Sequence, residues 1–155
     1  MKYLYPVLLF LCLAVAIYSN NKSKPKSEYR LVVERGAFHY DKFDITKNKI
    51  KYIPNSSASD QVEEYKGHSE TFLDSLSTIG FFKKIEADGF WSLKDRYSAV
   101  SSCTSQLIIT LEVNGKAKTV ICDDFERNCP DLIKYIDKKA VEFEGNDLKR
   151  IFLPG

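Results

Sequence analysis

The sequence predicts an α+β fold, in which an antiparallel sheet of order β-β-β-α-β-β-α carries two helices packed on one face. Three observations predict it. Short runs of β-branched and aromatic residues precede the first helical segment. Two segments carry apolar residues at helical spacing. Between these segments, the pair Asn114-Gly115 separates two alternating runs, which is the strongest short signal of a β-hairpin.

The first three strands form a predicted meander. Tyr29–Arg35 is rich in branched residues, Phe38–Thr46 alternates, and Ile50–Ile53 follows a turn and ends at Pro54. Val62–Lys66 is a candidate for a further strand. These runs lie close together in the sequence, so we expect neighbouring antiparallel strands.

The first helix is predicted over Ser69–Ala87, with Ser69 as its N-cap and Asp88-Gly89 as its stop. Its apolar residues recur three and four positions apart and should form one buried stripe. The members of this stripe are Phe72, Leu76, Ile79, Phe82 and Ile85.

The hairpin is predicted over Gln106–Cys122. A two-residue turn pairs Val113 with Lys116, Ile109 with Val120 and Leu107 with Cys122, and this register separates the side chains into two faces. One face is largely polar. The other should lie under the helices and consists of Leu107, Ile109, Leu111, Val120 and Cys122.

The last helix should begin near Cys129-Pro130, because proline fits the first helical position and Asp131 suits the positive end of the helix dipole. Gly145 ends it, and Ile151–Leu153 is a candidate for a short terminal strand. Its predicted apolar stripe consists of Leu132, Ile133, Ile136, Ala140 and Phe143.

Residues 1–16 have the pattern of a secretory signal peptide. Lys2 precedes an apolar run, and Ala14-Val15-Ala16 is a small-x-small cleavage site. Two alternatives stay open: an uncleaved anchor through residues 3–18, which is shorter than the ~20 residues of a typical span, and lipid attachment at Cys12. Residues 17–28 are expected to form a flexible basic linker, and residues 29–155 a single domain, at the periplasm or cell envelope.

The composition argues against nucleic-acid binding, because 23 Lys and Arg residues nearly balance 21 Asp and Glu residues. We identify no catalytic, metal-binding or cofactor-binding residues. His39 with Asp41 and Asp44 could supply at most two ligands from one side of a strand. His39 and His68 are far in sequence from every cysteine, so nothing places a base beside a thiol.

Three cysteines remain after signal cleavage. Export exposes them to oxidising conditions, so they can form one disulfide and leave one thiol over. Cys103 and Cys129 both follow the open end of the hairpin and form the favoured pair. A Cys122–Cys129 bond and no bond are the alternatives, with Cys122 then a small buried hydrophobe.

Two aromatic residues between the helix and the hairpin are candidates for partner binding. Phe90 and Leu93 should enter the core, whereas Trp91 and Tyr97 could either close the core or anchor a partner. The sequence around them decides nothing further.

The segment Gly89–Tyr97 and the hairpin Ile109–Val120, followed by the Cys-Pro-Asp-Leu helix start, resemble a family of small exported bacterial domains of unknown function. Many members carry a cysteine in a first turn, where this chain has Arg35-Gly36-Ala37-Phe38-His39-Tyr40. The layout is also distantly similar to the emfourin-type inhibitors of metallopeptidases, at the level of fold.

These observations lead to a non-enzymatic exported envelope protein that binds an unknown protein or cell-surface partner. The alternative is an inhibitor of a metallopeptidase, which rests on the fold analogy. A small hydrolase using Ser or Cys would need a base that the sequence does not place.

Overall fold

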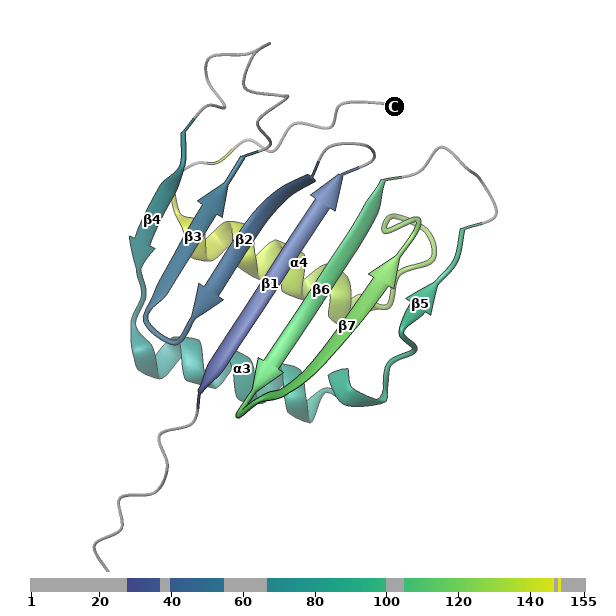
Figure 1. Ribbon diagram of the computed structural model, residues 1–155, viewed down its shortest axis with the longest axis horizontal. Coiled ribbons are helices and arrows are strands. Elements are labelled where there is room, and N and C mark those ends of the chain that lie inside the picture. The colour runs from purple at the N-terminus through teal and green to yellow at the C-terminus, as the bar shows by residue number, and fades with distance from the viewer. Residues whose placement is uncertain (1–27, 37–39, 55–66, 100–104, 147, 149–155) are drawn as a thin grey trace, which may run out of the picture.

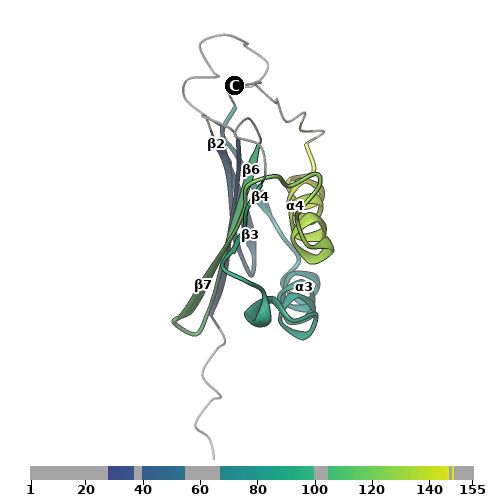
Figure 2. The same cartoon turned by 90° about the vertical axis from the view of Figure 1, so that its right-hand side faces the viewer.

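The computed structural model describes residues 28–36, 40–54, 67–99, 105–146 and 148. One seven-stranded sheet runs through them in the order β4-β3-β2-β1-β6-β7-β5 (Figure 1). All neighbouring strands are antiparallel except β5, which runs parallel to β7. Both helices cover the same face of this sheet (Figure 2), which confirms the predicted α+β class.

The predicted meander is present as β1 (Tyr29–Gly36), β2 (Tyr40–Thr46) and β3 (Lys49–Ile53). The second strand is described from Tyr40, and its predicted first two residues, Phe38 and His39, lie outside the described residues. The candidate strands Val62–Lys66 and Ile151–Leu153 also lie outside them.

The predicted helix Ser69–Ala87 is wrong in its first turns. Ser69–Phe72 forms strand β4, which pairs with β3, and α3 spans Ser75–Ala87. The cap is Asp74, whose carboxylate accepts a 2.8 Å hydrogen bond from the Ser77 amide, and not Ser69. As a strand, this segment forms main-chain hydrogen bonds with β3, which it could not form as part of a longer helix. Tertiary contacts of this kind override the helical spacing of the apolar residues.

The buried face of α3 therefore differs from the predicted apolar stripe. Phe72 and Leu76 are 81% and 82% exposed, although both were expected in the core. Ile79 is partly buried, whereas Phe82 and Ile85 are fully buried as predicted. The buried face of α3 consists of Thr78, Phe81, Phe82 and Ile85.

The hairpin is confirmed in its turn, register and faces. Strands β6 (Gln106–Val113) and β7 (Lys116–Cys122) pair as predicted, from Val113 with Lys116 to Leu107 with Cys122. Asn114 and Gly115 both have positive φ, 52° and 82°, as a type I′ turn requires.

The last helix, α4, spans Asp131–Glu144, so Pro130, predicted at the first helical position, is the N-cap instead. Gly145 ends it with φ 72°. Its buried face keeps Ile133, Ile136 and Ala140. Two acidic residues that the apolar pattern did not include, Asp137 and Glu144, are buried on it as well.

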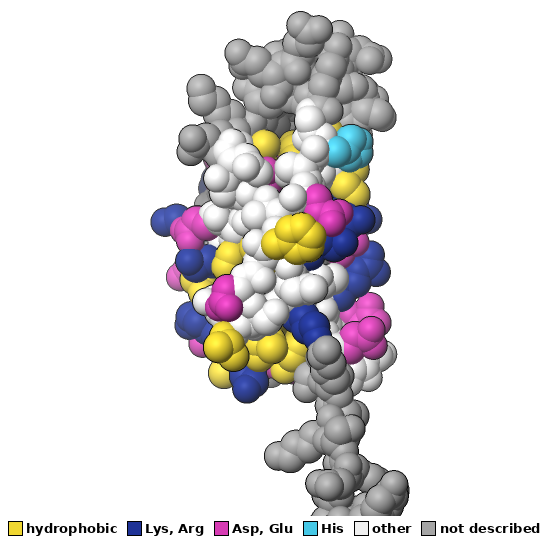
Figure 3. Space-filling view, turned by 90° about the vertical axis from the view of Figure 1, so that its left-hand side faces the viewer, with side chains coloured by type: hydrophobic (Ala, Val, Ile, Leu, Met, Phe, Trp, Pro, Cys, Tyr) yellow, Lys and Arg dark blue, Asp and Glu magenta, His cyan; other side chains and the backbone are white. Residues whose placement is uncertain are grey.

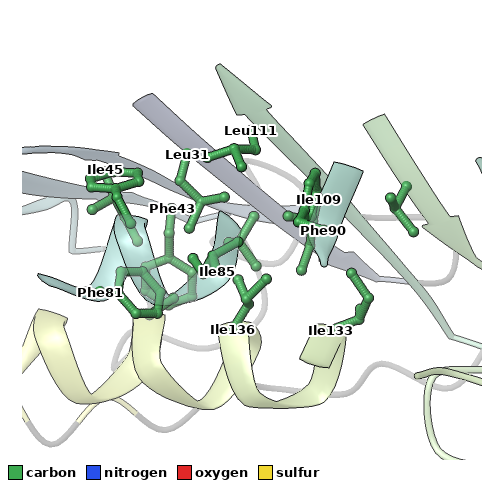
Figure 4. Close-up of a cluster of buried hydrophobic side chains, with 14 of the residues drawn as sticks. Leu31, Phe43, Ile45, Phe81, Ile85, Phe90, Ile109, Leu111, Ile133 and Ile136 are labelled. Carbon is green, nitrogen blue, oxygen red and sulfur yellow. The ribbon is translucent and has the colours of Figure 1, made fainter. Parts of the chain in front are cut away.

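The core fills the space between the sheet and the two helices (Figure 4). Strand residues such as Leu31, Phe43 and Ile109 face Ile85 from α3 and Ile136 from α4. Burial of each side chain of this size contributes roughly 1.5–3 kcal/mol to folding. The largest fully buried side chains are Phe43, Phe82, Phe90, Leu31, Ile45, Ile50, Ile85, Leu107, Ile109, Leu111, Ile133 and Ile136.

The buried acids hold α4 at its middle and at its C-terminal end. Asp137, at the middle, forms a 3.0 Å ion pair with Arg35 of β1, whose guanidinium lies 3.8 Å from the centre of the Phe125 ring. At the C-terminal end, Glu144 accepts hydrogen bonds from the Ser69 hydroxyl and the side-chain amide of Asn146, at 2.5 and 2.9 Å. These contacts attach the helix to strand β1 and to edge strand β4.

Candidate binding surface at the β7 edge

A short 3-10 helix, Phe90–Ser92, leads the chain from α3 back to the sheet. Gly89, with φ 91°, makes the sharp change of direction that ends α3, as the sequence predicted. Phe90 is fully buried and anchors the segment in the core, which confirms its predicted role. This anchor fixes the next residue, Trp91, at the border between the helix layer and strand β7.

Trp91 is half-buried and makes specific contacts on two sides. Its indole Nε1–H donates a 3.0 Å hydrogen bond to the Glu86 carboxylate. The ammonium of Lys116 lies 4.1 Å from the centre of its ring, within the range of a cation–π interaction. Part of the ring therefore closes the core next to Phe90, and part forms the wall of a surface beside β7.

Tyr97 has a more local role. Its hydroxyl accepts a 3.2 Å hydrogen bond from the Lys94 amide, and its carbonyl accepts one of 2.9 Å from the Asp123 amide. Arg96, its neighbour in β5 (Arg96–Tyr97), binds Asp123 through two hydrogen bonds of 2.9 and 2.7 Å. Tyr97 therefore helps to hold β5 against the end of β7.

Strand β5 covers the outer edge of β7 only in part. It pairs with Ile121 and Cys122, at the end of β7 that Figure 1 shows beside β5. The Ile121 amide points outward, since it donates to the Asp95 carbonyl at 2.9 Å. Main-chain groups alternate along a strand, so the amides and carbonyls of Ala117 and Thr119 point outward too. On this outer side, opposite β6, no strand of the described residues pairs with these two.

A hollow of about 620 Å³ lies beside this uncovered part of the edge. Lys118 reaches Asp95 across it with a 2.6 Å ion pair, in which the Asp95 side chain is 84% exposed and Lys118 only 18% exposed. Lys116 contributes its contact with Trp91. The residues that line the hollow are Trp91, Asp95, Lys116, Ala117, Lys118, Thr119 and Ile121.

The sequence contained a signal for this surface that the prediction did not use. The hairpin register opposes Lys116 to Val113 and Lys118 to Leu111, on the face that was expected to be apolar. Two lysines at the far end of a buried face indicate that the helices do not cover it there. The exposed edge of β7 follows from that pattern together with the short length of β5.

The predicted Cys103–Cys129 bond is wrong for Cys129, which is bonded to Cys122 with their Cα atoms 5.6 Å apart. Cys103 lies outside the described residues. The prediction placed Cys129 beyond the open end of the hairpin and included no turn that brings it back to β7. In the structure, a tight turn returns the chain, because the Asn128 and Arg127 amides bond to the carbonyl and carboxylate of Asp124 at 3.0 and 3.2 Å.

The candidate metal ligands do not come together in the described residues. His39 lies outside them, and Asp44 forms two hydrogen bonds with Arg30, which hold the pKa of Asp44 below its usual value. In the described part of the chain, no group of three or more His, Cys, Asp and Glu residues is placed to hold a metal. Neither of its helices is long and apolar enough to cross a membrane.

Comparison with family models and with curated proteins identifies no relative of this chain. No family model matches the chain, and no curated protein matches its sequence. The resemblances to exported bacterial domains and to emfourin-type inhibitors therefore stay predictions, and the function must be argued from the surface itself.

Proposed function

We propose that this protein is exported and that its α+β domain is a non-enzymatic module that binds a protein partner at the cell envelope. The observation that carries the proposal is the stretch of the β7 edge that no described strand covers, with Trp91 and the Lys118–Asp95 pair beside it. Proteins usually cover or block such edges, because free main-chain groups attract other strands. An uncovered edge next to a hollow is a suitable place for a partner.

The residues around this edge are of the types that stabilise protein interfaces. Tryptophan contributes strongly to binding when a partner removes it from water. Trp91 is already held by Glu86 and Lys116, so its ring would lose little freedom on binding. The hydrogen bonds of Tyr97 go to Lys94 and Asp123, which hold β5 in place, so we assign partner binding to Trp91 and a positioning role to Tyr97.

Export is supported by the sequence of residues 1–16 and is consistent with the disulfide. The apolar segment and its small-x-small site are typical of a signal peptide. Disulfides such as Cys122–Cys129 persist mainly in oxidising compartments. The envelope is therefore the place where we expect the partner.

Site-specific photo-crosslinking in the producing cells tests the proposal. A photoreactive residue at Thr119, which is exposed on the β7 edge, should give one discrete adduct with a protein. The change Trp91→Ala should reduce that adduct about tenfold or more, as expected for an interface anchor. The same group at Lys83, exposed on α3, is the matched control and should give no adduct.

Equal labelling at Thr119 and Lys83, or an adduct that Trp91→Ala leaves unchanged, would contradict the proposal. Mass spectrometry of the adduct identifies the partner. A metallopeptidase in that position would favour the inhibitor hypothesis over a general binding module.

A further inference from the structure

We infer that the β7 edge binds an extended peptide with acidic side chains at alternate positions, which joins the sheet as an added strand. This inference rests on the proposed function and specifies its ligand. Strand addition of this kind takes its affinity from main-chain hydrogen bonds and its selectivity from alternate side chains.

The main chain of β7 offers what an added strand needs. Ala117 and Thr119 direct their amides and carbonyls outward, in line with the Ile121 amide that already bonds to β5. Their side chains are small, and both are exposed on the open face of the sheet. Five of the seven residues of β7, Lys116–Val120, have no β5 partner, which is close to the length of an ordinary strand.

The charges beside the edge determine which peptide fits. Lys116 and Lys118 are two residues apart and lie on the helix side of the sheet, next to Trp91 and Asp95. Every second side chain of an added strand would face them on that side. Carboxylates at those positions would pair with the two lysines, and the highly exposed Asp95 can give way to one of them.

A second copy of this chain is a poor occupant of the same edge. Antiparallel pairing of two β7 strands about a twofold axis would bring Lys116 and Lys118 against the same lysines of the other copy. Like charges on opposed strands are destabilising, and lysines on edge strands act against such self-association.

The opposite edge of the sheet, β4, lacks these features (Figure 3). There Glu70 already binds both Lys49 and Lys51, at 3.0 and 3.3 Å. Phe72, the last residue of β4, is exposed, and the view shows hydrophobic side chains scattered among charged ones of both signs. One carboxylate thus neutralises both lysines of this edge, whereas at the β7 edge the highly exposed Asp95 pairs with Lys118 and Lys116 lies over the Trp91 ring.

The probe for the test is an eight-residue peptide of alternating Thr and Glu, blocked at both ends. Added to the full-length protein, it should shift the NMR signals of the Ala117 and Thr119 amides and slow their hydrogen exchange at least about tenfold, as new strand hydrogen bonds do. A peptide with Lys in place of Glu should bind at least about tenfold more weakly. A peptide methylated on alternate main-chain nitrogens should not bind.

Charge variants separate this edge from the general charge of the surface. Fluorescence anisotropy of the labelled peptide should show that Lys116→Gln with Lys118→Gln weakens binding about tenfold or more. The matched pair Lys49→Gln with Lys51→Gln, on β3, should leave binding unchanged. Added salt should weaken binding, because the attraction is between exposed charges.

Several results would overturn the inference. One is the absence of an anisotropy change at millimolar peptide, and another is equal binding of the Lys peptide. A third is a set of amide shifts centred on β4. The fourth is protection of Ala117 and Thr119 that, in the absence of peptide, depends on protein concentration. The last result would identify a second copy as the occupant. If the peptide fails while the Thr119 adduct persists in cells, strand addition is wrong and the proposed function stands.

Discussion

Glu144 shows how a single buried acid can stabilise this fold. It is only 2% exposed, and burial raises its pKa. Hydrogen bonds from Asn146 and Ser69 have the opposite effect and together hold the pKa below its ordinary value of 4.5. The folded state therefore favours the charged form more than the unfolded state does. Its contribution to stability is complete above pH 4.5 and is lost as the pH falls through the folded-state pKa.

The change Glu144→Gln should lower the free energy of unfolding at pH 7 by about 1–3 kcal/mol, since either orientation of the amide places an NH₂ group against a donor from Asn146. Urea unfolding from pH 7 to pH 3 should show this difference shrinking below pH 4.5. Glu142→Gln, an exposed change two residues away, is the control and should have little effect. A difference that is independent of pH would contradict the argument.

Asp137 is the second buried acid, and its role is to compensate a buried cation. The side chains of Arg35 and Asp137 are 14% and 10% exposed. Removal of one charge from such a pair deprives the other of this opposite charge inside the protein, which costs more than the pair itself contributes. The pair thus places β1 and α4 in one arrangement.

We expect Asp137→Asn to lower the free energy of unfolding by about 3–5 kcal/mol. The double change Arg35→Met with Asp137→Leu should recover most of that loss, because it removes both charges and keeps the volume. Denaturant unfolding of the single and double variants measures both effects. A loss below about 1 kcal/mol in Asp137→Asn would show that Arg35 needs no compensation there.

At the scale of elements, the hairpin and helix α3 contain glycines with opposite requirements. Gly115 sits in the turn with φ 82°, where an L side chain is strained. Gly80 lies inside α3, is exposed, and has open space where a Cβ would be. Only the turn therefore needs glycine for its conformation.

Alanine at each position should consequently change stability in opposite directions. Gly115→Ala should lower the free energy of unfolding by about 1–2 kcal/mol. Gly80→Ala should raise it by about 0.5–1 kcal/mol, because alanine has a higher helix propensity and a less flexible unfolded chain. Thermal unfolding of both variants provides the measurement, and a loss of stability in Gly80→Ala would show a packing role for that position.

The elements also show where local patterns are sufficient. The hairpin was predicted residue by residue, because its turn and its alternation specify the same register. The start of α3 was not, since Phe72 and Leu76 have helical spacing but the edge of β3 recruits Ser69–Phe72 as a strand. Strand β5 has only two residues and no pattern that could predict it.

At the scale of the whole molecule, processing of the N-terminus and pairing of the cysteines both change the mass of the chain. Intact mass of the protein from its native cells addresses both. We expect a chain that starts at Ile17 and is about two mass units lighter before reduction than after it, as one disulfide requires. Full length would instead support an anchor through residues 3–18.

Cysteine variants measured in the same way test the pairing. Cys103→Ala should keep the difference of about two mass units on reduction, and Cys129→Ala should abolish it. Loss of the difference in both variants would instead favour the Cys103–Cys129 bond. Loss of the Cys122–Cys129 bond should also lower stability by about 2–3 kcal/mol, as expected for a loop of this length.

The sequence by itself determined the class of fold, the order of the long elements, the hairpin register and the apolar face of α4, because each depends on periodicity or turn chemistry over a short stretch of chain. The tertiary structure alone decided which segment fills an edge of the sheet, which cysteine lies near Cys129, and which part of β7 is uncovered. These depend on the return paths of loops and on contacts between residues far apart in the chain, and local patterns do not encode them.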